Sequence, residues 1–552
     1  MNTATGSGPN PHTACVTETG TVHVPVLVVG GSLSGLSAAV LLSHHGVDCL
    51  VVERRSGIGN HPRSRVLTAR SGEVFRAIGL EPAIDAVSCR PSGWFQARTL
   101  ADATYTRLDP AEDPSTRISP AGSRLCDQNR LEPILLADAR RRGARVLFGW
   151  ELTDFVQEPH GVTARIVDRA TGWCRTVRCS YLLAADGTRS PVREALGIEL
   201  HGRRGEPRFL SAVFAADLDP VLRGRRPTAV VFPGREVLFA RGTPRAPLWE
   251  YGMPDSPFAA GACDDGPLGR FVLDRLRRVT GLPGLEPDVR SVLSWGASAV
   301  MADRLREGRV FLLGDAAHTM PVIGGLGGNT GIQDAHNLAW KIAAVLRGSA
   351  DGRLLDSYDV ERSRVAAHTL WHVLATARGL PQALHPETLQ LGCLYPDPGG
   401  GPDNGPCEDP YRPTGRPGSR APHLWLAHDR GRVSVLDLFR TGFTLLAGSL
   451  GQRWLPAGTR AAAVLGVPLA AHRIGGPRSA LRDPHGTFPA LYGIEPGGAV
   501  LVRPDGYVAR RWVTAPHPRT DLESAVREAL ERPAALSQEP ARSAVWAQPH
   551  RL

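Results

Sequence analysis

The apolar pattern near the start of the chain predicts a strand, a helix and a second strand in close succession. Residues 24–29 are continuously apolar and mostly β-branched, which is typical of a buried parallel strand. Residues 36–45 are small and apolar and favour a helix, and residues 48–52 form a second apolar run. We therefore expect a β-α-β unit at the beginning of an α/β domain.

The turn between this first strand and the helix is rich in glycine, and an acid follows the second strand. Residues 30–35 read Gly-Gly-Ser-Leu-Ser-Gly, so that Ser32 occupies the middle glycine position of a G-x-G-x-x-G motif. Such a turn lets the backbone approach a pyrophosphate at the helix N-terminus. Glu53 lies about 20 residues further on, where an acid accepts hydrogen bonds from a ribose. The unit favours FAD or NAD, although a glycine turn can also be purely structural.

Two later segments choose between these nucleotides. Residues 182–193 predict a strand that runs into a turn at Asp186-Gly187, and residues 310–331 predict a buried strand, Asp315 and a glycine-rich loop. A carboxylate at a strand end can hold the polyhydroxylated ribityl chain, and glycines let a planar ring lie against the backbone. Amides at a helix start can stabilise negative charge on a reduced ring. Together the three segments favour FAD over an ordinary glycine loop with a surface aspartate.

The helix after this loop has a regular apolar face. We expect it to begin near Ile332 and to end at Gly348. Its buried face comprises residues three and four positions apart, namely Ile332, Ala335, Leu338, Ala339, Ile342 and Leu346.

The order of these segments resembles that of the class A flavoprotein monooxygenases, the group of p-hydroxybenzoate hydroxylase and phenol hydroxylase. Within that group the chain is most similar to bacterial hydroxylases of aromatic polyketides, over roughly residues 22 to 515. The resemblance implies FAD as bound cofactor, with NADPH or NADH and O2 as co-substrates. It also implies an α/β fold with three parts: an FAD-binding Rossmann-like domain of the GR2 type, an antiparallel-sheet substrate domain and a thioredoxin-like C-terminal domain.

The same resemblance implies which residues contact FAD. Gly30, Ser32 and Gly35 would face the pyrophosphate, with Glu53 on the adenosine ribose, Arg63 at the diphosphate, Gln128 at the ribityl-diphosphate region, Leu152 near adenine, Asp315 on the ribityl chain, the amides of Gly328 and Asn329 at the flavin pyrimidine edge, and Leu33, Ser34, Arg54, Asp186 and Gly327 as further contacts. The backbone of Pro321 and Val322 would lie where the flavin reacts with oxygen. No catalytic side chain and no metal ligand is assigned.

Between residues 197 and 301 the pattern changes to short strands. The stretches 228–232, 236–240 and 291–300 are β-branched and alternate with Pro/Gly turns, which predicts an antiparallel sheet. Trp249, Tyr251 and Trp295 are candidates for lining a substrate pocket in this sheet, and ordinary core packing is the alternative for each of them.

The domain organisation follows from these patterns. We expect a disordered segment at 1–22, an FAD-binding domain formed by 23–196 and 302–395, and a substrate sheet at 197–301, with 90–125 contributing to the substrate side. A Pro/Gly-rich linker at 396–417 then leads to a C-terminal domain at 418–552.

Two elements of the C-terminal domain can be placed. A hairpin over 499–512 turns at Pro504-Asp505-Gly506, and Thr520 with Glu523 is expected to cap the following helix. This domain resembles the thioredoxin-like domain of polyketide hydroxylases. No cysteine follows Cys407, so it lacks the C-x-x-C motif of dithiol chemistry.

Composition excludes several other classes of protein. The formal net charge is +10, but the basic residues are scattered arginines with a single lysine, Lys341, so we expect no nucleic-acid partner. The nine cysteines include Cys174 and Cys179, which are expected to be unrelated free thiols. The first 22 residues lack the apolar run of a signal peptide, and no run reaches the length of a membrane span. We expect a soluble, cytoplasmic monomer or homodimer.

The function that these features imply is hydroxylation of a polycyclic aromatic polyketide in antibiotic biosynthesis. The same cofactor chemistry could instead give Baeyer–Villiger insertion, ring cleavage or oxidative rearrangement of a polycyclic quinone, or antibiotic inactivation. Flavin halogenation is disfavoured because the Trp-x-Trp-x-Ile-Pro run of that relative is absent. A non-enzymatic FAD scaffold is the third alternative.

Overall fold

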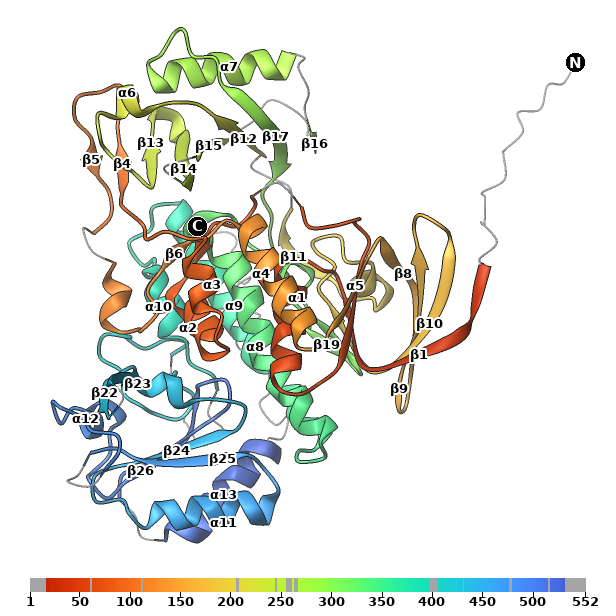
Figure 1. The fold of residues 1–552 in the computed structure, drawn as a ribbon, viewed down its shortest axis with the longest axis vertical. Coiled ribbons are helices and arrows are strands. Elements are labelled where there is room, and N and C mark those ends of the chain that lie inside the picture. The colour runs from red at the N-terminus through yellow and green to blue at the C-terminus, as the bar shows by residue number, and fades with distance from the viewer. Residues whose placement is uncertain are drawn as a thin grey trace, which may run out of the picture.

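Three layers of structure are stacked along the long axis of the molecule (Figure 1). A central α/β part lies between an antiparallel sheet at one end and a smaller C-terminal α/β part at the other. The computed structural model describes residues 16–59, 62–110, 113–204, 208–243, 246–254, 261–262, 267–396, 405–429, 431–475, 479–514 and 517–531.

The central part is built on a mostly parallel main sheet with the strand order β19-β20-β10-β1-β2-β7. Strand β1 lies in its middle and pairs in parallel with both β10 and β2, as expected for a buried strand. The bounds are β1 Val16–Val29, β2 Cys49–Glu53, β7 Arg145–Phe148, β10 Trp173–Ala184, β19 Arg306–Glu307 and β20 Val310–Leu312, with the antiparallel extension β8 Trp150–Glu158 and β9 Gly161–Asp168.

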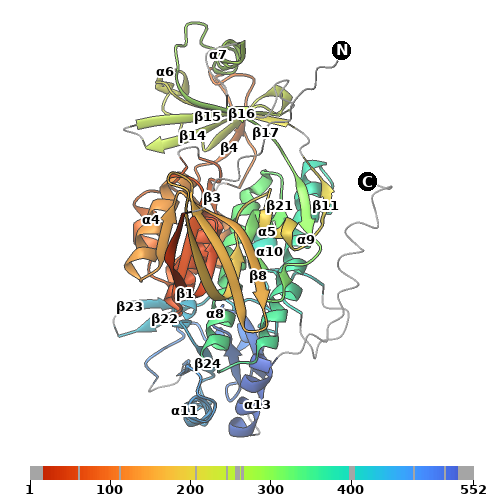
Figure 2. The ribbon, with the colours of Figure 1, turned by 90° about the vertical axis from the view of Figure 1, so that its right-hand side faces the viewer.

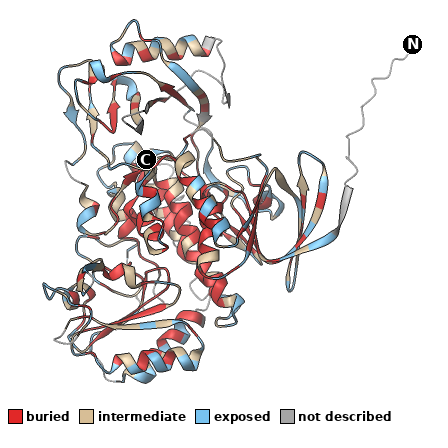
Figure 3. Cartoon of the chain, viewed as in Figure 1, coloured by how far each residue is buried: buried red, intermediate tan, exposed pale blue. Residues whose placement is uncertain are grey.

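Helices pack against the main sheet and against each other. Helix α1 contacts both α8 and α4, and Figure 3 shows that α8 is buried over most of its length. The helices of this part are α1 Leu33–His44, α2 Ala69–Ala77, α3 Glu81–Asp85, α4 Gln128–Arg141, α5 Pro191–Ala195, α8 Leu326–Leu346, α9 Asp356–Ala377 and α10 Pro386–Leu391. Short strands complete it: β3 Val66–Leu67 with β6 Arg124–Leu125, and β11 Leu200–Arg203 with β18 Ala299–Ala302 and β21 His318–Thr319.

The second sheet has the order β16-β17-β12-β15-β14-β13-β4-β5 and lies across one end of the central part (Figure 2). Its strands are β4 Trp94–Gln96, β5 Thr106–Arg107, β12 Arg208–Ala215, β13 Ala229–Val231, β14 Val237–Thr243, β15 Ala246–Pro254, β16 Gly261–Ala262 and β17 Asp288–Gly296. One face packs on α6 Asp219–Leu222 and α7 Pro267–Thr280, and its apolar residues form a separate core. Strand β4 comes from an earlier stretch of chain and pairs with β13 in parallel.

The C-terminal part contains a four-stranded sheet in the order β25-β24-β26-β27. Its elements are β22 Trp425–His428, β23 Gly431–Ser434, β24 Phe443–Ala447, α11 Trp454–Leu465, β25 Leu469–Arg473, α12 Phe488–Tyr492, β26 Ala499–Val502, β27 Val508–Trp512 and α13 Pro518–Glu531. The β26–β27 hairpin turns at the predicted residues, where Gly506 has a φ of +80°.

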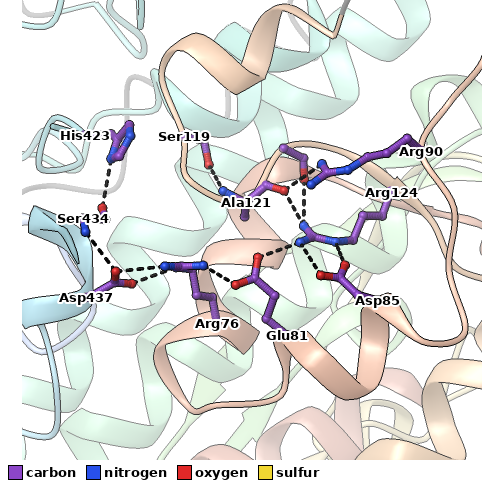
Figure 4. Close-up of polar contacts among 11 residues, drawn as sticks. Arg76, Glu81, Asp85, Arg90, Ser119, Ala121, Arg124, His423, Ser434 and Asp437 are labelled. Atoms are coloured by element: carbon purple, nitrogen blue, oxygen red, sulfur yellow. Dashed lines mark hydrogen bonds and ion pairs between the residues drawn. The ribbon is translucent and has the colours of Figure 1, made fainter. Parts of the chain in front are cut away.

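Polar side chains fasten this C-terminal part to the central one. Arg76 of α2 donates two hydrogen bonds to the Asp437 carboxylate, at 2.7 and 2.9 Å (Figure 4). Arg76 also pairs with Glu81, which in turn accepts a 2.6 Å bond from Arg124. The contact is bidentate and partly buried, so it fixes orientation as well as supplying attraction.

A second, fully buried ion network joins the β26–β27 turn to α8 and α9. Glu361 of α9 accepts hydrogen bonds from Arg503 at 2.6 and 2.9 Å and from Lys341 of α8 at 2.7 Å. Arg503 also donates to both carboxylate oxygens of Asp505, and Asp505 Oδ2 accepts the Trp340 indole N–H at 3.1 Å as well. The chain's single lysine thus lies inside the protein.

Three expectations about local structure are wrong. Residues 16–22 belong to β1, whose backbone continues alongside β10 over this stretch, whereas residues 1–15 lie outside the described residues. Helix α8 begins at Leu326 rather than near Ile332, because the glycine-rich residues 327–331 are already helical although they carry no apolar face. Helix α13 begins at Pro518, a residue suited to a first helical position, so Thr520 lies inside it.

One of the two neighbouring cysteines of β10 also differs from expectation. Cys174 is disulfide-bonded, whereas Cys179 is a free thiol, as predicted. Across the described residues, no helix is both long and apolar enough to cross a membrane.

Candidate functional site

A single continuous cavity of about 1870 Å³ lies between the central part and the second sheet. Pockets for one small ligand usually occupy about 300–1,000 Å³. The cavity therefore has room for a dinucleotide and a further molecule. The three segments singled out in the sequence meet on its wall, since Ser32, Asp186 and Asp315 all line it.

The first segment forms a tight turn that requires two of its glycines. Gly30 has a φ of +105°, and its N–H donates to the Val52 carbonyl at 2.8 Å. A Cβ on Gly35 would lie only 1.8 Å from the Gly30 carbonyl oxygen. The start of α1 is thus packed directly on the end of β1, which aims the helix N-terminus at the cavity.

Glu53 is held beside this turn. Its carboxylate accepts the Gly31 N–H at 2.8 Å and the backbone and side-chain N–H groups of Arg55, each at 2.9 Å. Burial raises the pKa of Glu53, but the hydrogen bonds from Arg55 and Gly31 outweigh burial and lower the pKa overall. The carboxylate is therefore ionised and oriented, as a ribose acceptor must be.

The serine in the glycine motif has a partner of its own. Ser32 Oγ donates to Glu132 Oε1 at 2.5 Å and accepts from Gln128 Nε2 at 2.9 Å. Gln128 also receives the Ser64 N–H at 3.2 Å. Ser32, which replaces the middle glycine of the motif, thus links the start of α1 to α4. The sequence patterns did not reveal that Glu132 takes part in this contact.

Two aspartates at strand ends bring carboxyl groups to the cavity wall. Asp186 accepts the Val192 N–H at 3.2 Å, and its Oδ1 is buried without a hydrogen-bond partner among the described residues. Asp315 is accessible from the cavity, although protein surrounds it. Burial raises the pKa of both, and the electrostatic effects of His318 and Arg63 oppose this rise at Asp315. Ligand hydroxyl groups would complete their hydrogen bonding.

The glycine-rich loop bends just before α8. Gly324 and Gly325 have φ values of +72° and +66°, and a Cβ on Gly325 would approach Val66 Cβ to 2.7 Å. Gly327 and Gly328 both line the cavity, and Gly327 has open space where a side chain would be. The N–H groups of this first helical turn lack intrahelical partners, which makes the helix start suited to an electron-rich ring edge.

Asn329 differs from its neighbours because its side chain points into the protein. It accepts the Thr68 N–H at 3.0 Å and donates to the carbonyls of Val66 and Gly325, both at 2.7 Å. It does not line the cavity. Its side chain holds β3 against the start of α8, so only its backbone amide is available for the predicted contact.

A buried network behind the loop was not apparent from the sequence. Asp334 of α8 accepts the Gly314 N–H at 3.1 Å, His318 Nε2 contributes a 2.7 Å bond, and Arg362 of α9 donates at 2.7 Å. Burial raises the pKa of Asp334, but His318 and Arg362 outweigh it and lower the pKa overall. The network fixes the turn that carries Asp315.

The residues predicted to contact the cofactor divide into two groups. Gly35 and Asn329 are internal, whereas the cavity is lined by Gly30, Ser32, Leu33, Ser34, Glu53, Arg54, Arg63, Gln128, Leu152, Asp186, Asp315, Pro321, Val322, Gly327 and Gly328. The carboxylates, the open glycine surface and the helix N-termini fit the ribityl chain, ring and diphosphate of FAD.

Two of the aromatic residues expected to line a substrate pocket do not line the cavity. Trp249 and Tyr251 lie in the core of the second sheet, where Trp249 Nε1 donates to the Ala216 carbonyl at 3.1 Å and Tyr251 OH to Glu236 at 2.8 Å. Successive residues of a strand face opposite sides, so Glu250 and Gly252 line the cavity instead. The side chain of Trp295 lies outside the described residues.

Metal-ligand geometry occurs once in the described residues, at Glu199, His201 and Asp303. This group is mostly exposed and does not line the cavity.

Comparison with known proteins agrees with the site. The "FAD binding domain" family matches residues 23–372, and the "Aromatic-ring hydroxylase, C-terminal" family matches residues 414–533. The tetracenomycin A2 monooxygenase-dioxygenase of Streptomyces glaucescens is 38% identical, over 93% of this chain and 97% of its own.

Two solved structures are similar over nearly the whole chain. A ternary complex of aklavinone-11 hydroxylase with FAD and aklavinone is 34% identical with a TM-score of 0.84, covering 92% of this chain and 99% of that one. The rebeccamycin biosynthetic enzyme RebC with reduced flavin is 30% identical with a TM-score of 0.77, covering 93% and 100%. FAD is therefore the cofactor, and monooxygenation implies O2 and a reduced nicotinamide as co-substrates. The chain belongs to the FAD-dependent aromatic-ring hydroxylases and is a flavoprotein monooxygenase.

Proposed function

We propose that this enzyme hydroxylates a polycyclic aromatic substrate of the polyketide class in antibiotic biosynthesis. The observation that carries the proposal is the cavity, which extends from the glycine turn of β1 to an apolar wall on the second sheet. Its volume exceeds what one ligand needs, and its wall of Phe209, Val237, Phe239 and Leu293 suits a flat aromatic ring system. The similarity to the tetracenomycin and aklavinone enzymes supports this substrate class.

We further propose how the chain's own residues hold FAD. The turn at Gly30 and the start of α1 bind the diphosphate with Arg63, while Glu53 accepts hydrogen bonds from the adenosine ribose. Asp315 receives the ribityl hydroxyl groups, and the amides at Gly327 and Gly328 face the electron-rich edge of the ring.

When bound, FAD accepts a hydride from NADPH or NADH and activates O2 for transfer to the substrate. The protein positions the aromatic ring, excludes water and supplies oriented dipoles. Pro321 and Val322 line the cavity beside the glycine loop, and their backbone would border the reacting oxygen.

The experiment uses purified protein reconstituted with FAD. Hydroxylated anthraquinones should stimulate NADPH or NADH oxidation, and the product should contain one labelled oxygen atom when the reaction is run under ¹⁸O2. Single-ring phenols serve as the size control and should stimulate less. Absence of oxygen incorporation from every polycyclic phenol would contradict the proposal.

A second candidate is oxygen insertion or oxidative rearrangement of a polycyclic quinone. It is favoured by the similarity to a monooxygenase-dioxygenase and to RebC. The structure of the labelled product separates the two, because hydroxylation retains the ring skeleton whereas insertion or rearrangement changes it.

A further inference from the structure

The cavity face of the second sheet carries a carboxylate on a mostly apolar wall. Glu250 of β15 lies opposite Val213 of β12 and Phe239 of β14. Its neighbours in sequence, Trp249 and Tyr251, point into the core, so the alternation of the strand directs Glu250 to the cavity. The strands that carry it span the end of the molecule next to the central part (Figure 2).

Ser211 of β12 holds this carboxylate. Ser211 lies opposite Gly252, which makes Ser211 and Glu250 diagonal neighbours across two strands. The Ser211 hydroxyl, itself buried, donates a hydrogen bond to Glu250 Oε1. The sheet therefore fixes the orientation of Ser211 and Glu250 at the cavity wall.

A recess lies beside the pair. Gly252 has no side chain, and a Cβ there would meet its nearest neighbour, the Val237 carbonyl oxygen, only at 3.8 Å. Phe239 and Leu293 supply apolar surface around this point. A flat ring could approach the sheet here and place a polar substituent at Glu250.

A carboxylate on such a wall is costly unless it has polar partners. Ser211 is one such partner of Glu250, and a carboxylate has enough acceptor sites to take a further hydrogen bond from a phenolic hydroxyl of the substrate. We propose that Glu250 accepts a hydrogen bond from a phenolic hydroxyl of the substrate and takes its proton during hydroxylation. This inference rests on the proposed function, and Ser211 acts as a positioning residue for Glu250.

The proton transfer is coupled to attack on the ring. An ordinary phenol has a pKa of about 10, so the phenol stays protonated and hydrogen-bonded before reaction at neutral pH. When a ring carbon bonds to the electrophilic oxygen, the ring loses electron density and its hydroxyl becomes strongly acidic. The phenolic O–H bond then breaks and an O–H bond forms on Glu250.

The proton balance closes as the ring regains aromaticity. The hydroxylated carbon loses its hydrogen as a proton, which goes to the second oxygen atom of O2, freed when the O–O bond broke, and this atom leaves as water. Glu250 returns the first proton to the phenolate oxygen. Glu250 thus ends ionised, ready for another cycle. No oxidant beyond the reduced cofactor and O2 of the monooxygenase reaction is needed.

The first test measures binding, which does not depend on turnover. The FAD holoenzyme is titrated with 2,6-dihydroxyanthraquinone, whose hydroxyl groups are too far from the ring carbonyls to bond to them, and with its dimethyl ether, which cannot donate a hydrogen bond. Wild type should bind the hydroxylated probe about 10-fold or more tightly than the ether, as expected for a hydrogen bond to a charged group. The variant Glu250→Leu should lose this preference, whereas Asp288→Asn, which removes an exposed carboxylate from β17 of the same sheet, should keep it.

The second test measures catalysis with whichever hydroxyanthraquinone wild type converts. Glu250→Gln should lower kcat about 100-fold with a much smaller change in KM. Reduced-nicotinamide oxidation should then release hydrogen peroxide instead of product. Glu250→Asp should recover part of the rate, as a base would but a spacer would not.

Two results would overturn the inference. One is equal affinity of wild type for the hydroxylated probe and its ether. The other is an unchanged kcat in Glu250→Gln. If wild type prefers the phenol but hydroxylates no polycyclic compound, the proposed function fails while the assignment of Glu250 as the phenol-binding residue stands.

Discussion

Replacing Glu361 with glutamine probes how the C-terminal part is fastened to the flavin-binding helices. The Glu361 carboxylate is 2% exposed and accepts hydrogen bonds from Arg503, Lys341 and Asn337, the last at 2.7 Å. An amide of the same shape removes the negative charge and turns N–H groups toward donors. Removing one partner of a buried ion pair costs about 3–5 kcal/mol, because the remaining charges stay buried.

The loss of stability caused by Glu361→Gln should depend on pH, because it changes the pKa of Lys341. Burial lowers the pKa of Lys341 to about 8, while Glu361 acts to raise it. Without Glu361 this folded-state pKa falls further below that of the unfolded chain, which is about 10.4. At pH values between the lowered pKa of Lys341 in the variant and pH 8, Lys341 is deprotonated in the folded variant but still protonated in folded wild type. The stability gap should therefore narrow by about 1.4 kcal/mol per pH unit as pH rises toward 8.

The assay compares thermal and urea unfolding of both proteins at pH 6 and pH 8, followed by tryptophan fluorescence and by release of FAD. Glu523→Gln is the matched control, because its partner Arg460 is 47% exposed and such surface pairs contribute about 0–1 kcal/mol. If Glu361→Gln unfolds like this control at pH 6, the buried network does not fasten the two parts. A gap that widens with pH would refute the role assigned to Lys341.

Three further predictions concern the cofactor side of the cavity. Gly35→Ala should cost about 1–3 kcal/mol of stability and release FAD on gel filtration, because the new Cβ meets the Gly30 carbonyl; Gly57→Ala, which has open space, should do neither. Asp315→Ala should weaken FAD binding about 10–100-fold in a fluorescence titration with little change in the melting temperature of the apoprotein, and unchanged affinity would contradict its role. Asp334→Asn should destabilise the protein above pH 4, and its deficit relative to wild type should shrink below pH 4. The folded-state pKa of Asp334 is depressed, so its stabilisation is lost as pH falls through that value, and acid titration of the unfolding midpoint measures this.

The elements that could be predicted from sequence are those with local periodicity. The β1 strand, the Asp186 and Asp315 turns and the β26–β27 hairpin each combine an apolar run with a turn residue that fixes its end. The start of α8 could not be placed, because apolar periodicity reports which face is buried and residues 327–331 have no apolar side chains to report it.

The alternation of apolar and charged residues in β15 indicated the core and cavity faces of the strand, and the prediction assigned them the wrong way round. Trp249 and Tyr251 suggested an aromatic pocket, but bulky apolar residues that alternate with a charged one normally mark the core face. Glu250 between them pointed to the cavity. Interactions between distant parts of the chain were not accessible in this way: Asp334 pairs with Arg362 and Glu361 with Arg503, which is 142 positions away.

The position of Arg503 and Asp505 in the sequence has a consequence for biosynthesis of the enzyme. A ribosome completes the β1 turn, Asp186 and Asp315 long before it reaches the β26–β27 turn, which secures α8 and α9 through Glu361. Until that turn emerges, Glu361 lacks the two hydrogen bonds that Arg503 donates to it. A nascent chain should therefore capture FAD only loosely at first, and retain it firmly once nearly all of the polypeptide has been made.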